Sequence, residues 1–253
     1  MKRPLARIGL LPPESSIGGS GRPATDMRLA IIVPVLNEAD GIGRTLAALQ
    51  LLRARGARVI VVDGGSADGT VDIARALADD VIAAARGRAR QMNAGAQHIG
   101  DAAEVLLFLH ADTRLPPDTD QRIADAIGAG ARWGRFDVRL YGRAVMLRCV
   151  ALSMNWRSRL TGICTGDQAI FVERTLFASL GGFADQPLME DIEFTRRARR
   201  IAWPAALPGA VTSGRRWEQR GVWFTILQMW SLRWRYWRGA DPTALASEYR
   251  EVR

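Results

Sequence analysis

The stretch ARVIVVDGGSADGT, residues 57–70, decides the fold class. Four successive apolar residues, Val59 to Val62, leave no polar face, which is typical of a strand covered by other elements on both sides. Asp63 and two glycines follow at once, and this combination predicts a tight turn. We therefore expect a buried strand of a parallel sheet whose carboxyl end lies at Asp63.

The segments on either side of this strand alternate between strand and helix patterns. Residues 28–37 (RLAIIVPVLN) are a β-rich run, and residues 41–56 (GIGRTLAALQLLRARG) have helical apolar spacing closed by a glycine. Beyond the central strand, the patterns predict a helix, a short strand, a second helix and a strand at residues 71–80, 80–85, 88–99 and 104–113. This order predicts an α/β fold with a doubly wound, mainly parallel sheet.

Polar residues follow the strands at their carboxyl ends, where ligands bind in such sheets. They are Asn37 and Glu38, then Asp63, then His110 and Asp112. The simplest alternative needs no ligand, because Asn and Asp are ordinary turn formers after a strand. Their recurrence at successive strand ends favours a shared crevice.

Composition sets the limits of this interpretation. A chain of 253 residues that is 48% hydrophobic can form one α/β domain with an appendage. Its net charge of +9 favours an anionic partner, which charge alone leaves open between nucleic acid, a phospholipid surface and a nucleotide diphosphate.

The two cysteines and the N-terminal residues bear on location. Cys149 and Cys164 have neither metal-ligand nor disulfide spacing, which fits a reducing, cytoplasmic compartment. Residues 1–27 are rich in Pro, Gly, Ser and Arg and lack the apolar centre of a signal peptide, so we expect a disordered extension.

Four motifs, in this order and spacing, carry a resemblance to a known family. They are IIVPVLNEADGI, VVDGGSADGT, LHADTRLP and MEDIEFTRR, and together they span roughly residues 29–200. The chain resembles family-2 glycosyltransferases with the GT-A fold, and it is most similar to a small bacterial subgroup with HAD at the metal position and RRW near the C-terminus. The resemblance implies transfer of a sugar from a nucleotide diphosphate donor to an acceptor, with Mg²⁺ or Mn²⁺ holding the diphosphate.

The metal position implied by the resemblance is His110 and Asp112, where the family usually has Asp-x-Asp. A carboxylate such as Asp112 is a hard oxygen ligand that these cations prefer, with waters and substrate phosphate completing the shell. His110 would ligate the metal, hydrogen bond a phosphate or water, or only pack. A divalent cation would stabilise the negative charge that builds on the departing diphosphate.

The resemblance also implies donor-binding residues in the first half of the chain. Asp63 would contact the base or ribose, and Arg88 would meet the donor. The other donor-binding residues would be Pro34, Asn37 and Glu38 around the nucleoside, and Asn93 and Gly95 where the backbone approaches the donor. An amphipathic surface helix is the alternative for residues 88–99.

The second half would supply the acceptor side and the catalytic base. In TGDQAIFVER, Gly166, Asp167 and Gln168 would line the acceptor side. An inverting transfer needs a carboxylate that takes the proton from the acceptor hydroxyl. By resemblance this base is Asp191, with Glu190 orienting it or holding the acceptor. The alternative is that the pair only places favourable charge at a helix start.

The C-terminal segment departs from the pattern of processive relatives. SGRRWEQRG, residues 213–221, resembles a shortened Gln-x-x-Arg-Trp motif without its Gln, which favours a single addition over polymer synthesis. Arg215 or Arg216 would grip the diphosphate, and Trp217 would stack near the acceptor.

Residues 222–238 predict an amphipathic helix. At about 100° per residue, one stripe contains Trp223, Leu227, Trp230, Trp234 and Trp237. Tryptophan with arginine suits the interface of an anionic membrane, whereas a span of the bilayer needs about 20 apolar residues. The alternatives are peripheral contact with the inner face of the cytoplasmic membrane, which would suit a lipid-linked acceptor, and docking of the helix on the protein itself.

These observations divide the chain into an extension (1–27), a GT-A domain (28–214) and a helical segment (215–253).

Two other functions compete with glycosyl transfer as interpretations of the sequence. A sugar-phosphate nucleotidyltransferase would need a glycine-rich, Arg-containing loop after the first strand, which PVLNEADG lacks. A basic nucleic-acid-binding module would explain the charge, but acidic strand ends would repel phosphate, so we expect no nucleic acid partner.

Overall fold

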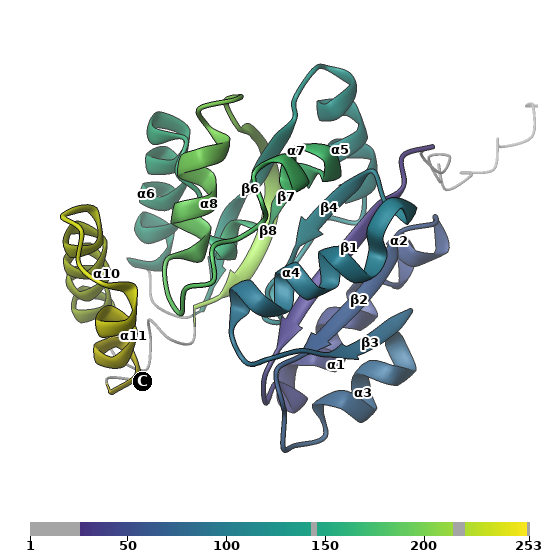
Figure 1. Cartoon of the computed structure of the whole chain (residues 1–253), viewed down its shortest axis with the longest axis horizontal. Helices are drawn as coiled ribbons and strands as arrows, with labels where there is room; N and C mark the ends of the chain where they lie inside the picture. The colour runs from purple at the N-terminus through teal and green to yellow at the C-terminus, as the bar shows by residue number, and fades with distance from the viewer. Residues whose placement is uncertain (1–25, 143–145, 215–220, 252–253) are drawn as a thin grey trace, which may run out of the picture.

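The computed structural model describes residues 26–142, 146–214 and 221–251. A sheet of eight strands crosses the molecule in the order β3-β2-β1-β4-β7-β6-β8-β5 (Figure 1). The strands are β1 (Leu29–Val35), β2 (Arg58–Asp63), β3 (Asp80–Ala83), β4 (Val105–Phe108), β5 (Thr113–Arg114), β6 (Trp133–Tyr141), β7 (Ile170–Glu173) and β8 (Ala205–Ser213).

The sheet is mixed and mostly parallel. β1 runs parallel to β2 and β4, β2 to β3, and β6 to β8. β7 lies antiparallel between β4 and β6, and β5 is antiparallel to β8. The predicted α/β class with a doubly wound, mainly parallel sheet is therefore confirmed.

Helices cover both faces of this sheet (Figure 1). They are α1 (Ala39–Ala48), α2 (Gln50–Ala54), α3 (Thr70–Leu77), α4 (Arg88–Ile99), α5 (Thr119–Gly128), α6 (Met146–Thr161), α7 (Arg174–Ser179), α8 (Glu190–Ala198), α10 (Val222–Trp237) and α11 (Pro242–Glu251), with short 3-10 turns η1 (Gly100–Ala102) and η2 (Gly166–Gln168).

The alternation of side chains along the strands divides the core in two. Ile31 and Val33 of β1 pack with residues of α1, α3, α5 and α6 on one face. Ile32 of the same strand packs with residues of α4, α7 and α8 on the other face. Because side chains alternate across a strand, continuous apolar runs are required to fill both cores.

One predicted helix differs in the structure. The pattern of residues 41–56 predicts a single helix, but the chain forms α1 and α2 with a break at Leu49, which has φ −89° and ψ −7° and is buried. The predicted helices 71–80 and 88–99 correspond to α3 and α4.

The C-terminal helices form a third, smaller cluster. Leu232 of α10 packs with Leu245 and Tyr249 of α11, and both contact Met189, the residue before α8. The described C-terminal residues are thus joined to the start of α8. Of the predicted disordered extension, all but Asp26 and Met27 lies outside the described residues.

Candidate active site

The loops after β1 and β2 are locked to each other at the carboxyl edge of the sheet. The backbone N–H of Asn37 donates to Ser66 Oγ at 2.9 Å, and that of Glu38 donates to Thr70 Oγ1 at 2.8 Å. Asn37 has a positive φ of 54°, a conformation that Asn tolerates better than most residues. Asp63 accepts backbone hydrogen bonds from Gly65 and Ser66, each at 3.0 Å. The predicted donor side is therefore preorganised.

Gln91, a residue that sequence reasoning did not select, fixes the start of α4 against this edge of the sheet. Its buried Nε2 donates to the carbonyl oxygens of Val35 at 2.8 Å and Val62 at 2.7 Å. The amide thereby satisfies two carbonyls at the strand ends, which would cost free energy if buried without a partner. A lone glutamine within a helical pattern gives no signal of this contact.

The antiparallel pairing of β4 and β7 joins the predicted donor and acceptor sides. Phe108 at the end of β4 pairs with Ile170 at the start of β7, so the residues after β4 lie beside those before β7. His110 Nδ1 is 3.1 Å from Asp167 Oδ1. Gly166 lies against the imidazole ring, because a Cβ added there would be 2.3 Å from Nε2. His110 therefore packs against Gly166 and also makes a hydrogen bond to a protein carboxylate, a contact that sequence reasoning did not consider.

Asp191 lies on the other side of Gly166. The Gly166 N–H donates to Asp191 Oδ2 at 2.8 Å, and the Ile192 N–H donates to Oδ1 at 2.7 Å. A cavity of about 10 Å³ is lined by Met92, Phe108, His110, Gly166, Ile170, Phe183, Glu190 and Asp191. The structure thus brings together the predicted base, its neighbour and the first residue of the predicted metal motif.

The residue before the carboxylate pair has a strained backbone. Met189 caps α8 with a φ of 65°, in the left-handed region that costs a residue other than Gly on the order of 1–3 kcal/mol. Its side chain is held in the cluster with Leu232, Leu245 and Tyr249. Packing of the C-terminal helices therefore fixes the turn that presents Glu190 and Asp191.

The Glu190 carboxyl is a buried acid beside a second acid. The residue is 5% exposed, and burial, together with the negative charge of Asp191, raises its pKa, while the positive charge of Arg88 acts in the opposite direction. The surrounding protein disfavours the charge of Arg88, but Glu190 and Asp167 outweigh that effect and raise its pKa. Arg88 remains accessible to solvent, so this cation is available to a ligand.

Replacing Glu190 with Gln is expected to flatten the pH dependence of stability. Because the folded protein holds this proton more tightly than the unfolded chain, the free energy of unfolding falls as the pH rises from the ordinary pKa of 4.5 to the raised value. One group contributes at most about 1.4 kcal/mol per pH unit. Urea unfolding across this range should show the reduced slope in Glu190→Gln and the wild-type slope in Asp72→Asn, an exposed control. An unchanged slope in Glu190→Gln would contradict the assignment.

Two arginines that sequence reasoning missed lie near the predicted acceptor side. Burial lowers the pKa of Arg233 on α10, and the charges of Asp191 and Asp167 partly offset this effect. Burial, together with the nearby charge of Arg233, lowers the pKa of Arg157 on α6 to about 10. These couplings place both cations near the predicted base. No local motif marks these arginines, because α6, α10 and the start of α8 are far apart in the sequence and meet only in the folded chain.

Asp112, the predicted metal ligand, is exposed just beyond β4. Within the described residues, no group of three or more His, Cys, Asp or Glu side chains forms a ready metal cage. A single exposed carboxylate nevertheless fits Mg²⁺ or Mn²⁺, which are commonly held by one or two carboxylates together with substrate phosphates. The donor set therefore fits a cation that arrives with a nucleotide diphosphate.

Several predicted site residues make structural contacts. The side chain of Asn93 bonds both backbone groups of Phe183, at 2.8 and 3.0 Å. Gly95 packs closely on β1 and β2, where a Cβ would be 2.6 Å from the Ile32 side chain. Gln168 is fully buried and donates to Ser158 Oγ at 3.0 Å. Their contacts with donor or acceptor stay untested predictions.

Two residues predicted to surround the nucleoside lie on β1 and at the start of α1. Pro34 is buried within β1, and Glu38 is half-buried at the start of α1. The predicted residues Arg215, Arg216 and Trp217 lie outside the described residues.

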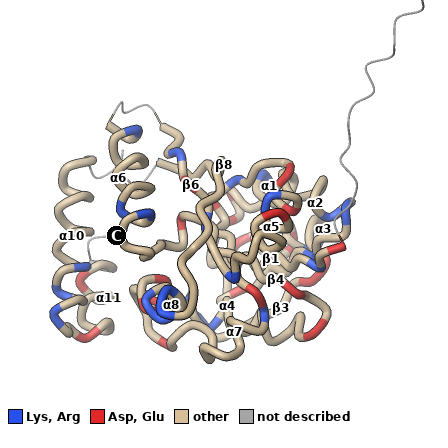
Figure 2. The backbone as a smooth tube through the Cα atoms, turned by 90° about the horizontal axis from the view of Figure 1, so that it is seen from above, with Lys and Arg blue, Asp and Glu red and all other residues tan. Residues whose placement is uncertain are grey.

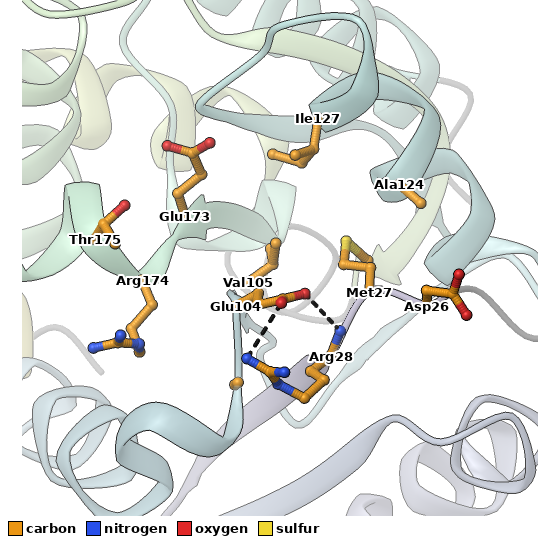
Figure 3. Close-up of a pocket in the computed structure, with 11 residues that line it drawn as sticks. Asp26, Met27, Arg28, Glu104, Val105, Ala124, Ile127, Glu173, Arg174 and Thr175 are labelled. Carbon is orange, nitrogen blue, oxygen red and sulfur yellow. Dashed lines mark hydrogen bonds and ion pairs between the residues drawn. The ribbon is translucent and has the colours of Figure 1, made fainter.

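A larger cavity, of about 520 Å³, lies at the opposite end of β1 and β4 (Figure 3). Arg28 and Glu104 in its wall bond each other, at 3.2 Å through both the backbone N–H and the guanidinium of Arg28. Because ligands of doubly wound sheets bind at the carboxyl ends of the strands, this cavity is not the candidate site.

Comparison with known proteins gives three kinds of match. The model of "Glycosyl transferase family 2" matches residues 30–170. Succinoglycan biosynthesis protein ExoA from Rhizobium meliloti is 29% identical over 133 residues, which cover 49% of this chain and 40% of that protein. The chain thus spans less than half the length of this curated relative.

Solved structures share the fold. TarS 1–349 from S. aureus in complex with UDP-GlcNAc has a TM-score of 0.61 and 20% identity, over 74% of this chain and 58% of that chain. The mannosyltransferase PcManGT from Pyrobaculum calidifontis, with GDP-Man and Mn²⁺, has a TM-score of 0.53 and 24% identity, over 76% and 58%. Glucosyl-3-phosphoglycerate synthase from Mycobacterium tuberculosis, with Mn²⁺ and UDP, has a TM-score of 0.53 and 17% identity, over 74% and 71%.

Proposed function

The chain belongs to glycosyl transferase family 2 and is a glycosyltransferase of the GT-A fold; from this premise we propose a metal-dependent, inverting, single transfer of a sugar from a nucleotide diphosphate donor. The family match does not support the nucleotidyltransferase or the nucleic-acid-binding module. The observation that carries the proposal is the meeting of Asp191, Glu190 and His110 around Gly166, where the ends of β4 and β7 adjoin.

In this proposal Asp191 is the catalytic base. It takes the proton from the acceptor hydroxyl while the oxygen attacks the anomeric carbon from the face opposite the leaving group. Backbone N–H groups of Gly166 and Ile192 fix the two carboxylate oxygens. Because the carboxylate is preorganised, little reorganisation is needed when the proton moves.

Neighbouring residues would orient the base and the donor. Glu190, buried beside Asp191, would orient it or hold the acceptor, and its burial together with the charge of Asp191 raises its pKa. Arg88 is an accessible cation in the same group of charges and would contact the donor. His110 would position Asp167, to which it is hydrogen bonded, on the acceptor side.

Asp112 would hold the divalent cation, with His110 as the second candidate ligand. When bound, the cation supplies positive charge that neutralises the diphosphate as it leaves. Complexes of PcManGT and glucosyl-3-phosphoglycerate synthase contain Mn²⁺. They support a divalent metal in the fold, and we propose Mg²⁺ or Mn²⁺ here.

The acceptor side completes the proposal. Gly166, Asp167 and Asp191 would face the acceptor, and the missing Gln of the processive motif supports a single addition. We also place residues 222–238 in peripheral contact with a membrane, which supports a lipid-linked acceptor.

A thermal-shift screen of UDP, GDP and dTDP sugars, with and without Mn²⁺, tests the donor class. One nucleotide is expected to stabilise the protein only with metal, by ~2.7 kcal/mol at a hundredfold excess over Kd. For a chain of this size that corresponds to a rise in melting temperature of roughly 5–10 °C. A chelator should abolish the shift. If no nucleotide shifts the melting temperature and no activated sugar is transferred, the proposed function is wrong.

A further inference from the structure

The predicted apolar stripe of α10 faces solvent. Its five members, Trp223, Leu227, Trp230, Trp234 and Trp237, are between 58% and 77% exposed. The opposite side of the helix packs through Leu232, which is fully buried against α11 and Met189. The helix is therefore docked on the protein, as one of the two alternatives from sequence has it, but through the face opposite the stripe, and the stripe itself stays exposed. An exposed apolar surface of this kind marks a binding surface.

The chemistry of this face fits an anionic bilayer. Tryptophan favours the region between head groups and acyl chains, and the Arg238 guanidinium lies over the Trp234 ring at 5.0 Å. No described helix is long and apolar enough to cross a membrane, so the contact would be peripheral.

The charge of the protein favours an anionic bilayer over a second copy of the chain as the partner of this surface. Basic residues gather on α6, α8 and α10 (Figure 2), and the chain carries a net charge of +9. Each cation near an anionic surface contributes about 1 kcal/mol of attraction. Two copies would repel each other through the same charges.

One flank of α10 bears an arginine, Arg233, that lies close to the candidate site. Arg233 lies about 80° around the helix from the middle of the stripe, by the rotation of about 100° per residue. It is near Asp191, Asp167 and Arg157. Figures 1 and 2 both show α10 beside α6, the helix that carries Arg157. A helix with side chains is about 10–12 Å across, so a bilayer on the stripe would lie at about that distance from these cations.

Arg157 has unused hydrogen-bonding capacity. Among the described residues, its Nε and Nη2 atoms are buried and have no hydrogen-bond partner, while Nη1 donates to the Ile163 carbonyl at 3.3 Å. A buried donor without a partner costs about 1–3 kcal/mol, and more when the group is charged. An anionic group placed between Arg157 and Arg233 would satisfy these donors and relieve the repulsion between the two cations.

We propose that the protein docks on an anionic membrane through the outer stripe of α10 and takes from it a lipid acceptor whose anionic head group binds Arg233 and Arg157. This inference rests on the proposed function, because it names the acceptor class of the same site. Phosphate is the head-group chemistry that matches paired guanidinium groups most directly.

Sedimentation of the full chain with vesicles tests the docking. We expect binding to vesicles of equal parts phosphatidylglycerol and phosphatidylcholine, with weaker binding to phosphatidylcholine alone. Trp230→Glu with Trp234→Glu should weaken the binding at least ~10-fold, because charge replaces two interfacial anchors. Leu51→Glu is the matched control, since Leu51 is also exposed but lies on α2. Absence of binding by the wild type, or equal binding by the stripe variant, would overturn the proposal.

A second experiment tests the anionic head group and its source. Phosphatidylglycerol vesicles are expected to raise the melting temperature of the wild type more than inorganic phosphate at equal phosphate concentration, and Arg233→Gln should reduce both shifts. If phosphate alone stabilises the protein as well as vesicles do, a soluble acceptor replaces the lipid one. If Arg233→Gln changes neither shift, the arginine site is wrong.

A measurement of donor binding distinguishes a failure of this inference from a failure of the proposed function. The stripe variant and Arg233→Gln are expected to keep the metal-dependent thermal shift with the nucleotide. Intact nucleotide binding without vesicle binding would overturn only the acceptor class, whereas loss of nucleotide binding in the wild type would remove the proposed function itself.

Discussion

Asp191→Asn is expected to reduce sugar transfer by about 10²–10⁴-fold, the usual contribution of a general base. Asn has nearly the shape of Asp and can accept from the Gly166 N–H, while its NH2 group then faces the Ile192 N–H, and it cannot take the acceptor proton. Donor binding should therefore be unchanged. The measurement is the initial rate of transfer, compared with the metal-dependent thermal shift of the same variant.

Asp72→Asn is the matched control for this prediction. The same chemical change falls on an exposed carboxylate of α3, whose i, i+3 contact with Arg75 is long at 3.4 Å. Transfer by this variant should stay within about twofold of the wild type, as expected for a surface change of small energetic effect. Unchanged turnover in Asp191→Asn would remove the base assignment.

Asp112→Asn is the second substitution with a large expected effect. Loss of the carboxylate should remove the metal-dependent part of the donor thermal shift and reduce transfer by about 10²–10³-fold, the scale of one lost electrostatic contact in a transition state. Titration of Mn²⁺ into the nucleotide-bound protein measures the first effect. Metal-dependent binding that survives this substitution would contradict the ligand assignment.

His110→Ala distinguishes the two roles left for that residue. If His110 ligates the cation, the variant should lose metal-dependent donor binding as Asp112→Asn does. Its hydrogen bond to Asp167 Oδ1 instead predicts retained donor binding with slower transfer, because Asp167 would lose its orientation. The comparison of the two variants is therefore more informative than either alone.

Part of the sheet could be predicted from sequence because three of its strands contain continuous apolar runs. β1, β2 and β4 are buried on both faces, so hydrophobicity alone marks them. β6 is different. It contains Arg135, which is only 1% exposed and forms an ion pair with Asp137 within the same strand. Its charged residues hide a buried strand, and part of their compensation comes from another element, because Arg159 of α6 also pairs with Asp137.

The same reasoning explains which parts of the candidate site were predicted. His110, Asp112, Glu190 and Asp191 follow strands or begin helices in recognisable motifs. Arg157 and Arg233 lie inside helices whose sequences fit a basic amphipathic surface, and only the packing of α6 and α10 near the start of α8 brings them together. Convergence of segments far apart in the chain leaves no spacing that could be recognised in advance.

The outward orientation of the α10 tryptophans has a kinetic consequence. An enzyme anchored by this face would meet its acceptors by lateral diffusion, so its turnover would depend on how many acceptor molecules occupy a given area of bilayer. Diluting the vesicles in buffer would then change the rate little once the protein is bound, whereas diluting the acceptor with inert lipid would lower it in proportion.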